Sequence, residues 1–238
     1  MSRRFLALLL ALSVLFCILP TFAEDPDDDD DWFDDDEETG FEEEEEKQDF
    51  KTVSGYDTGE MFQFGDFFYQ ITEDGNGAVL TKYSHNQAEL TFPAEVDNGL
   101  PVVAIAIGLC AFDPVIESVV IPGTVTTIPN RAFATCPNLK SVILEEGVTD
   151  LEMCCFGGCE NLESIQFPST LINIGNFAFA ACPKLQEVVF GSELKTIGMQ
   201  AFFQCDELKK AVIPGGDTVE IGDKAFELCS DEFQISAE

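Results

Sequence analysis

The chain repeats one order of residue types about every 23 positions. The stretch "IGNFAFAACPKLQEVVF", residues 174–190, is preceded one cycle earlier by "LEMCCFGGCENLESIQF" and followed one cycle later by "IGMQAFFQCDELKKAVI". Each copy has a Phe, a Cys three residues later, a Leu three residues after that, and then two β-forming residues separated by one. A chain that repeats such an order folds into similar units that pack against one another.

The Phe residues define the register of the copies. Their separations are 21, 23, 23, 23 and 24 residues, and the set is Phe112, Phe133, Phe156, Phe179, Phe202 and Phe226. An apolar residue stands five positions before each of them, at Ile107, Ile128, Leu151, Ile174, Ile197 and Ile221. The shorter first copy has Val115 in the Cys slot, and we interpret it as carrying a two-residue deletion before Ile116.

Each copy also contains a pair of apolar residues with the two-residue period of a strand. The pairs are Val119/Ile121, Val142/Leu144, Ile165/Phe167, Val188/Phe190 and Ala211/Ile213. One coil cannot bury its apolar side chains alone, whereas coils stacked about 4.8 Å apart bury them against the same residue types. A period of about 20 to 29 residues with Leu-type positions is typical of leucine-rich repeats. The sequence therefore predicts a mostly β repeat solenoid, a right-handed coil, over residues 101–238.

The repeats resemble those of the BspA-like leucine-rich repeat family of secreted and cell-surface proteins. The resemblance is clearest in "IGNFAFAACPKLQEVVF" and "IPNRAFATCPNLKSVILEEGVTDL", and it extends over residues 62–235. Residues 51–100 are similar to the β-hairpin lead-in, or cap, that opens many of these domains; Asp74, Gly75, Asn76 and Gly77 supply its tight turn. The resemblance implies extracellular recognition or adhesion.

Residues 1–23 have the pattern of a signal peptide. Arg3 and Arg4 precede an apolar run over residues 5–19, and Thr21 and Ala23 are the small residues of a cleavage site. The run of 15 residues is shorter than the roughly 20 that cross a bilayer, although an uncleaved anchor is the alternative. The pattern predicts cleavage after Ala23, a secreted or cell-surface protein, and no membrane span after signal removal.

Residues 24–50 form an acidic run that predicts a disordered, extended spacer. It contains 18 of the acids that give the chain its net charge of −33. The acids from Asp27 to Glu38 partly match a calcium-binding loop, but Trp32 stands where that loop requires Gly, so we expect no metal site. Residues 51–238 carry 27 acids against 9 bases, and such a surface repels phosphates, so nucleic acid is not an expected partner.

The sequence predicts no catalytic residue and no cofactor. His85 is the only His and follows Ser84 in a predicted surface turn, so a hydrolase is the least favoured function. Removal of the signal peptide leaves eight of the nine Cys. Five of them share the repeat slot three residues after the Phe, where their Cβ vectors run parallel, and we expect free thiols packed as small apolar side chains.

An outward-facing strand surface is the predicted binding site, since the residue between each inward pair must point to solvent. This strand face consists of an apolar line, Val120, Ile143, Gln166, Val189 and Val212, beside a polar line, Ser118, Ser141, Ser164, Glu187 and Lys210. It contains no aromatic residue for sugar stacking, which favours an extracellular protein partner on a host or neighbouring cell. The alternative is a self-associating structural protein that pairs through the last strand, which holds Phe233 and Ile235.

Overall fold

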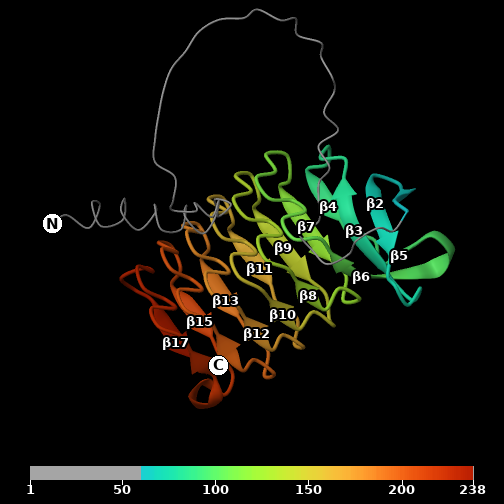
Figure 1. Ribbon diagram of the computed structural model, residues 1–238. Helices are drawn as coiled ribbons and strands as arrows, with labels where there is room; N and C mark the ends of the chain where they lie inside the picture. The colour runs from blue at the N-terminus through green and yellow to red at the C-terminus, as the bar shows by residue number, and fades with distance from the viewer. Residues whose placement is uncertain (1–59, 238) are drawn as a thin grey trace, which may run out of the picture.

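The computed structural model describes residues 60–237, which form a β-solenoid preceded by a β-sheet cap (Figure 1). The predicted signal peptide (residues 1–23) and acidic spacer (residues 24–50) lie outside the described residues. Within residues 60–237, no helix has both the length and the apolar character needed to cross a membrane.

The cap is a five-stranded sheet in the order β1-β2-β3-β6-β5. β1, β2 and β3 are antiparallel neighbours, so the predicted hairpin lead-in is confirmed. Its turn closes where the amide of Thr72 donates to the carbonyl oxygen of Gly77 at 2.9 Å. A one-turn 3-10 helix, η1 (Asp97–Gly99), joins β5 to β6. The strands are β1 (Phe62–Phe64), β2 (Phe67–Ile71), β3 (Ala78–Tyr83), β5 (Glu95–Val96) and β6 (Leu100–Ile105).

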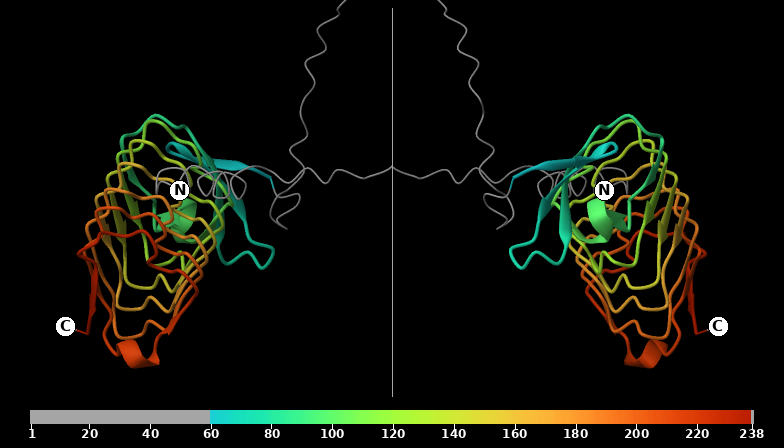
Figure 2. Two further views of the ribbon diagram at one scale, coloured as in Figure 1. Left: turned by 90° about the vertical axis from the view of Figure 1, so that its left-hand side faces the viewer. Right: turned by 90° about the vertical axis from the view of Figure 1, so that its right-hand side faces the viewer.

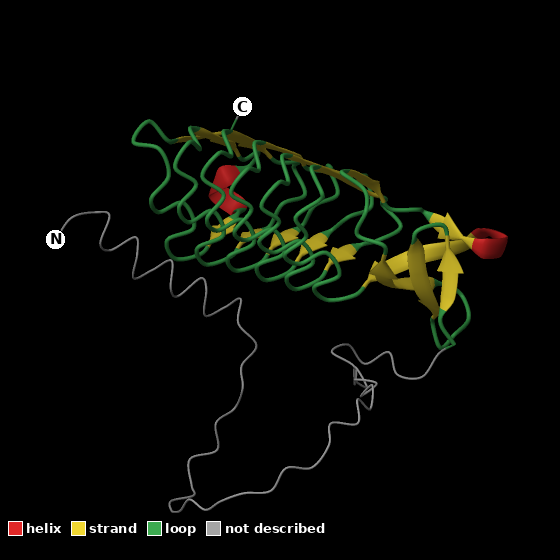
Figure 3. Ribbon diagram, turned by 90° about the horizontal axis from the view of Figure 1, so that it is seen from above, coloured by secondary structure: helices red, strands yellow, loops and turns green. Residues whose placement is uncertain are grey.

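The solenoid stacks its coils through parallel strands on two opposite sides (Figure 3), and the coils nest one behind another when viewed along the stack (Figure 2). The short-strand side has β8 (Thr127–Ile128), β10 (Asp150–Leu151), β12 (Asn173–Ile174), β14 (Thr196–Ile197) and β16 (Glu220–Ile221). The long-strand side has β4 (Glu89–Thr91), β7 (Ser118–Ile121), β9 (Ser141–Leu144), β11 (Ser164–Gln166), β13 (Glu187–Val189), β15 (Lys210–Val212) and β17 (Gln234–Ser236), and a second 3-10 turn, η2 (Gly216–Thr218), follows β15. Register partners are about one repeat apart, as with Asp150 and Asn173.

The predicted interior column of Phe rings is present from the second copy onward. The rings of Phe133, Phe156, Phe179 and Phe202 stack at centroid distances of 5.1 to 5.4 Å, within 9° of parallel. Phe226 continues the column at 5.2 Å. Each ring therefore covers the ring of the coil below, which is why the same residue type recurs in each copy.

The first copy departs from the sequence interpretation, because Phe112 is not part of the column. Its side chain is 56% exposed, and Cys110 occupies the column position instead. The amide of Cys110 bonds to the Ala132 carbonyl, as the amide of Phe133 bonds to the Cys155 carbonyl one coil later. The spacing from Cys110 to Phe133 is a full 23 residues, so there is no two-residue deletion.

The same correction shifts the other slots of the first copy. Ile105 is buried in the position assigned to Ile107, whose side chain is exposed. Asp113, rather than Val115, occupies the Cys slot, and it is buried. Phe112 lies at a left-handed backbone position, with φ of 61°, that recurs in each coil. A large apolar side chain is unusual at such a position.

The Cys ladder consists of free thiols, as predicted. None of the eight Cys in residues 60–237 forms a disulfide, and all but Cys229 are buried. The structure adds a polar role for these thiols. Each ladder thiol donates a hydrogen bond to a backbone carbonyl oxygen of the preceding coil, as Cys182 does to Phe156 at 3.3 Å. Burial raises the pKa of Cys182 and Cys205 well above the ordinary value, so these thiols stay protonated donors.

Candidate functional site

The predicted apolar line of the strand face lies on the long-strand side, with one correction. Ile143, Gln166 and Val189 are exposed, Val189 to 53%, and Val120 is half-buried. Val212 was predicted to be exposed but is only 8% exposed. It lies on β15, between Val189 of β13 and Ser236 of β17.

The predicted polar line accompanies the apolar line. Ser164, Glu187 and Lys210 are exposed, and Ser118 and Ser141 are half-buried. Lys210 Nζ lies 3.2 Å from Glu187 Oε1, so the charged end of this line is internally paired. Because both partners are solvent-exposed, the ion pair adds little stability and leaves the surface available.

The strand face is divided into two parts, which the repeat pattern did not indicate. β4, β7, β9 and β11 form one sheet, and β13, β15 and β17 form another. The division falls where Phe167 and Phe190 replace the Ile121 and Leu144 of earlier copies; their rings pack at 4.9 Å and 36°. The exposed Gln166 of β11 lies between Ile143 of β9 and Val189 of β13, so the apolar line is presented as two patches, one around Ile143 and one around Val189.

The opposite, short-strand side carries a hydrogen-bonded polar ladder. Thr196 Oγ1 donates to Asn173 Oδ1 at 2.8 Å, and Asn173 Nδ2 donates to Asp150 Oδ1 at 2.7 Å. Thr149 Oγ1 donates to the other oxygen of Asp150 at 2.6 Å. These groups satisfy one another between coils, so this side is better explained by stacking than by ligand binding. Sequence analysis did not identify it.

A polar cluster centred on the buried Asp113 joins the cap to the first coil. Asp113 accepts hydrogen bonds from Tyr83, from the amides of Val115 and Ile116, and lies 2.6 Å from His85 Nδ1. Burial alone would raise the pKa of Asp113, but these hydrogen bonds together outweigh it and lower that pKa.

This cluster does not assemble a hydrolase site. The Ser84 hydroxyl donates to the Asp66 carbonyl oxygen at 3.2 Å, and the His85 ring packs against Tyr83 with centroids 4.1 Å apart. Over the described part of the chain, no group of three or more His, Cys, Asp or Glu could hold a metal ion. The cluster is an attachment point between the cap and the solenoid.

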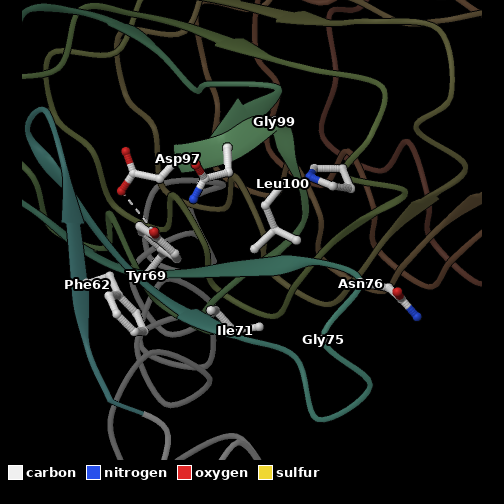
Figure 4. Close-up of a pocket in the computed structure, with 10 residues that line it drawn as sticks. Phe62, Tyr69, Ile71, Gly75, Asn76, Asp97, Gly99 and Leu100 are labelled. Carbon is white, nitrogen blue, oxygen red and sulfur yellow. Dashed lines mark hydrogen bonds between the residues drawn. The ribbon is translucent and has the colours of Figure 1, made fainter.

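A hollow of about 500 Å³ lies on the cap (Figure 4), and none of its lining residues belongs to the strand face. Its lining comes from the first two strands, the turn that follows them, and η1 with the start of β6. The Tyr69 hydroxyl donates to Asp97 Oδ2 at 3.0 Å and connects the strand to η1. Sequence analysis treated this region only as a lead-in, because the two turns are far apart in the chain.

The parallel coils, the Phe column and the 23-residue register define a leucine-rich repeat solenoid. The chain belongs to the BspA-type leucine-rich repeat family, whose model matches residues 106–232 in six copies. No curated protein matches the chain.

Three crystal structures illustrate the similarity. A leucine-rich repeat protein of T. pallidum is 29% identical, with a TM-score of 0.68, over 75% of this chain and 83% of that chain. A leucine-rich cell surface protein of Faecalibacterium prausnitzii is 27% identical, with a TM-score of 0.60, over 75% and 51%. The pneumococcal vaccine antigen PcpA is 25% identical, with a TM-score of 0.61, over 72% and 48%. The chain thus spans about half the length of the last two.

Proposed function

We propose that this protein is a secreted or cell-surface recognition module that binds an extracellular protein through its strand face. The observation that carries the proposal is that Ile143 and Val189 lie exposed on regular strands. Neither side chain is needed in the core, because the inward residues of the same strands fill it. Stacked strands present a broad, rigid surface, and exposed apolar positions bordered by polar ones are typical of protein contact sites.

Two further observations support the proposal. The family and the cell-surface protein of Faecalibacterium prausnitzii agree with the export signal predicted over residues 1–23. The described strand face has no aromatic residue on its outward positions, which favours a protein over a glycan as its partner.

The test is a double variant, Ile143→Lys with Val189→Lys, which places one charge on each of the two patches. Both side chains point to solvent, so folding should be unchanged, while capture of biotin-labelled surface proteins from neighbouring cells should fall by about tenfold or more. Thr126→Lys with Ser192→Lys adds the same charge at exposed positions outside the strand face. Equal capture by the two variants would refute the choice of surface.

Self-association is the second candidate, favoured by the last described coil. Ile221 and Ile235 occupy inward repeat slots yet are exposed, and they border a hollow of about 550 Å³. Sedimentation of the whole chain over a hundredfold concentration range tests it. A monomer at all concentrations would remove this candidate, whereas a dimer that Ile235→Lys dissociates would support it.

A further inference from the structure

We propose that the hollow on the cap binds a carbohydrate, at a site separate from the strand face. Its residues come from two segments, 62–76 and 97–101, that sheet pairing and the Tyr69–Asp97 hydrogen bond hold together. The volume of about 500 Å³ lies within the range of about 300 to 1,000 Å³ typical of small-molecule sites.

One wall of the hollow is an apolar surface suited to the C–H face of a sugar ring. Tyr69 is only 3% exposed and supports the half-buried ring of Phe62, which stacks on it with centroids 5.5 Å apart and 27° from parallel, so Phe62 presents the ring surface of this wall. Ile71, 42% exposed, continues this wall, and Leu100 lies beside it (Figure 4). An aromatic face carries partial negative charge, which attracts the slightly positive C–H groups of a ring laid on it.

The rim of the hollow supplies exposed hydrogen-bonding groups. Asp97 and Asn98 line it with exposed side chains, and Asn76 lines it from the turn, with its amide directed away from Phe62 and Tyr69 (Figure 4). A carboxylate has about four acceptor positions, and Tyr69 takes one of those on Asp97. Burial and then the Asp97 hydrogen bond raise the pKa of Tyr69, so it remains a neutral donor that fixes the carboxylate.

The rim groups are held by two turns that adopt left-handed backbone conformations. Asn98 has φ of 61° and Gly75 has φ of 72°. The amide of Asn76 donates to Asp74 Oδ1 at 3.1 Å, and its side chain donates to Asp74 Oδ2 at 3.2 Å. The donors and acceptors are therefore in place before a ligand arrives, which lowers the entropic cost of binding.

The composition of the lining selects among ligand classes. None of the ten residues that line the hollow is Lys or Arg, and Asp97 is an anion, so a phosphate or carboxylate ligand would be repelled. Phe62 and Tyr69 stack on each other instead of surrounding a central point, so they do not form an aromatic cage for a quaternary ammonium group. A neutral ring with one apolar face and several hydroxyl groups matches both the wall and the rim.

The experiment is saturation-transfer NMR of the whole chain with glucose, galactose, mannose, N-acetylglucosamine and lactose, each at millimolar concentration, and with choline as the cationic probe. We expect transfer to at least one sugar and none to choline. Phe62→Ala and Asp97→Asn should each weaken the binding of that sugar by about tenfold. Asp97→Asn keeps an acceptor for Tyr69, and thermal unfolding checks that both variants fold.

Two controls separate this site from the strand face. Glu73→Ala removes an exposed carboxylate next to the hollow that does not line it, and should bind the sugar as the parent does. Ile143→Lys with Val189→Lys should also leave sugar binding unchanged, whatever it does to protein capture. Absence of saturation transfer to every sugar, transfer to choline alone, or unaltered affinity in both Phe62→Ala and Asp97→Asn would overturn the proposal.

Discussion

The first coil and the interior coils share one backbone path but fill it with different chemistry. In the interior coils a Phe ring and a Cys thiol occupy the two central slots, and in the first coil these slots hold Cys110 and Asp113. The difference follows from what lies on the next layer. Phe156 and Phe179 each meet a stacked Phe ring on both sides, and Phe133, the first ring of the column, meets Phe92 edge-on at 5.9 Å and 89°. The first coil instead meets the cap, through Asp113 with Tyr83 and His85.

The Cys slot shows the same dependence on its neighbours. An interior thiol donates to a carbonyl of the preceding coil, as Cys136 does to Cys110 at 3.0 Å. Asp113 instead accepts, because the cap presents donors in Tyr83 and His85. A repeat slot is therefore defined by backbone geometry. The residue type that suits the slot depends on the groups that the neighbouring coil or the cap presents to it.

The largest predicted effect on stability distinguishes a Phe of the interior column from Phe112, which lies outside the column. Phe156→Ala removes a ring that two others cover, and we expect a loss of about 4 kcal/mol in the free energy of unfolding. Phe112→Ala, in the exposed position of the first coil, should cost less than about 1 kcal/mol. Urea unfolding followed by circular dichroism measures both, and equal losses would contradict the register described here.

The next effect concerns the polar attachment of the cap. Asp113→Cys gives the first coil the interior residue and leaves the Tyr83 hydroxyl and two amides without their acceptor, so we expect a loss of about 3 kcal/mol at pH 7. Urea unfolding measures the loss, and an unchanged midpoint would show that the cluster does not stabilise the cap.

The pH dependence provides a second measurement at the same site. The folded pKa of Asp113 is lowered, so its contribution is present above the unfolded pKa of about 3.9 and is lost as pH falls toward the folded value. The stability difference between the parent and Asp113→Asn should therefore shrink from pH 6 to pH 3. A constant difference would mean that the carboxylate is not the stabilising form.

A smaller effect is expected in the thiol ladder. Cys182→Ala removes a buried sulfur atom and its hydrogen bond to the Phe156 carbonyl oxygen, and should cost about 1 to 2 kcal/mol. Cys182→Ser keeps a donor of smaller size, and comparison of the two in urea unfolding separates volume from hydrogen bonding. A larger loss in Ser than in Ala would show that the slot requires an apolar residue.

The smallest effect tests the left-handed positions that recur in each coil. Gln200 has φ of 52°, so Gln200→Gly should relieve strain and raise stability by about 1 kcal/mol. The thermal midpoint should rise by a few degrees at most. A fall would show that the Gln200 side chain contributes more than its backbone costs.

Sequence reasoning identified the interior coils because each slot there is occupied by one residue type. It misplaced the first copy because Phe112 offered the expected residue two positions away from the slot that Cys110 fills. It predicted correctly that Ile143 and Val189 are exposed, since alternation along a strand is local. It misjudged Val212, which is buried although Ile143, also on a strand with neighbours on both sides, is exposed, so alternation along a strand does not by itself set the exposed fraction.

The amino-acid sequence by itself determined the family, the 23-residue period and the inward side of each strand, because these follow from spacing along the chain. Only the tertiary structure showed that Asp113 is hydrogen-bonded to Tyr83 and His85 of the cap. It alone also showed that Asp97, Phe62 and Tyr69 line one hollow. Those contacts join residues about 30 positions apart, within the cap for Tyr69 and Asp97 and between the cap and the first coil for Tyr83 and Asp113, and no period in the sequence encodes them.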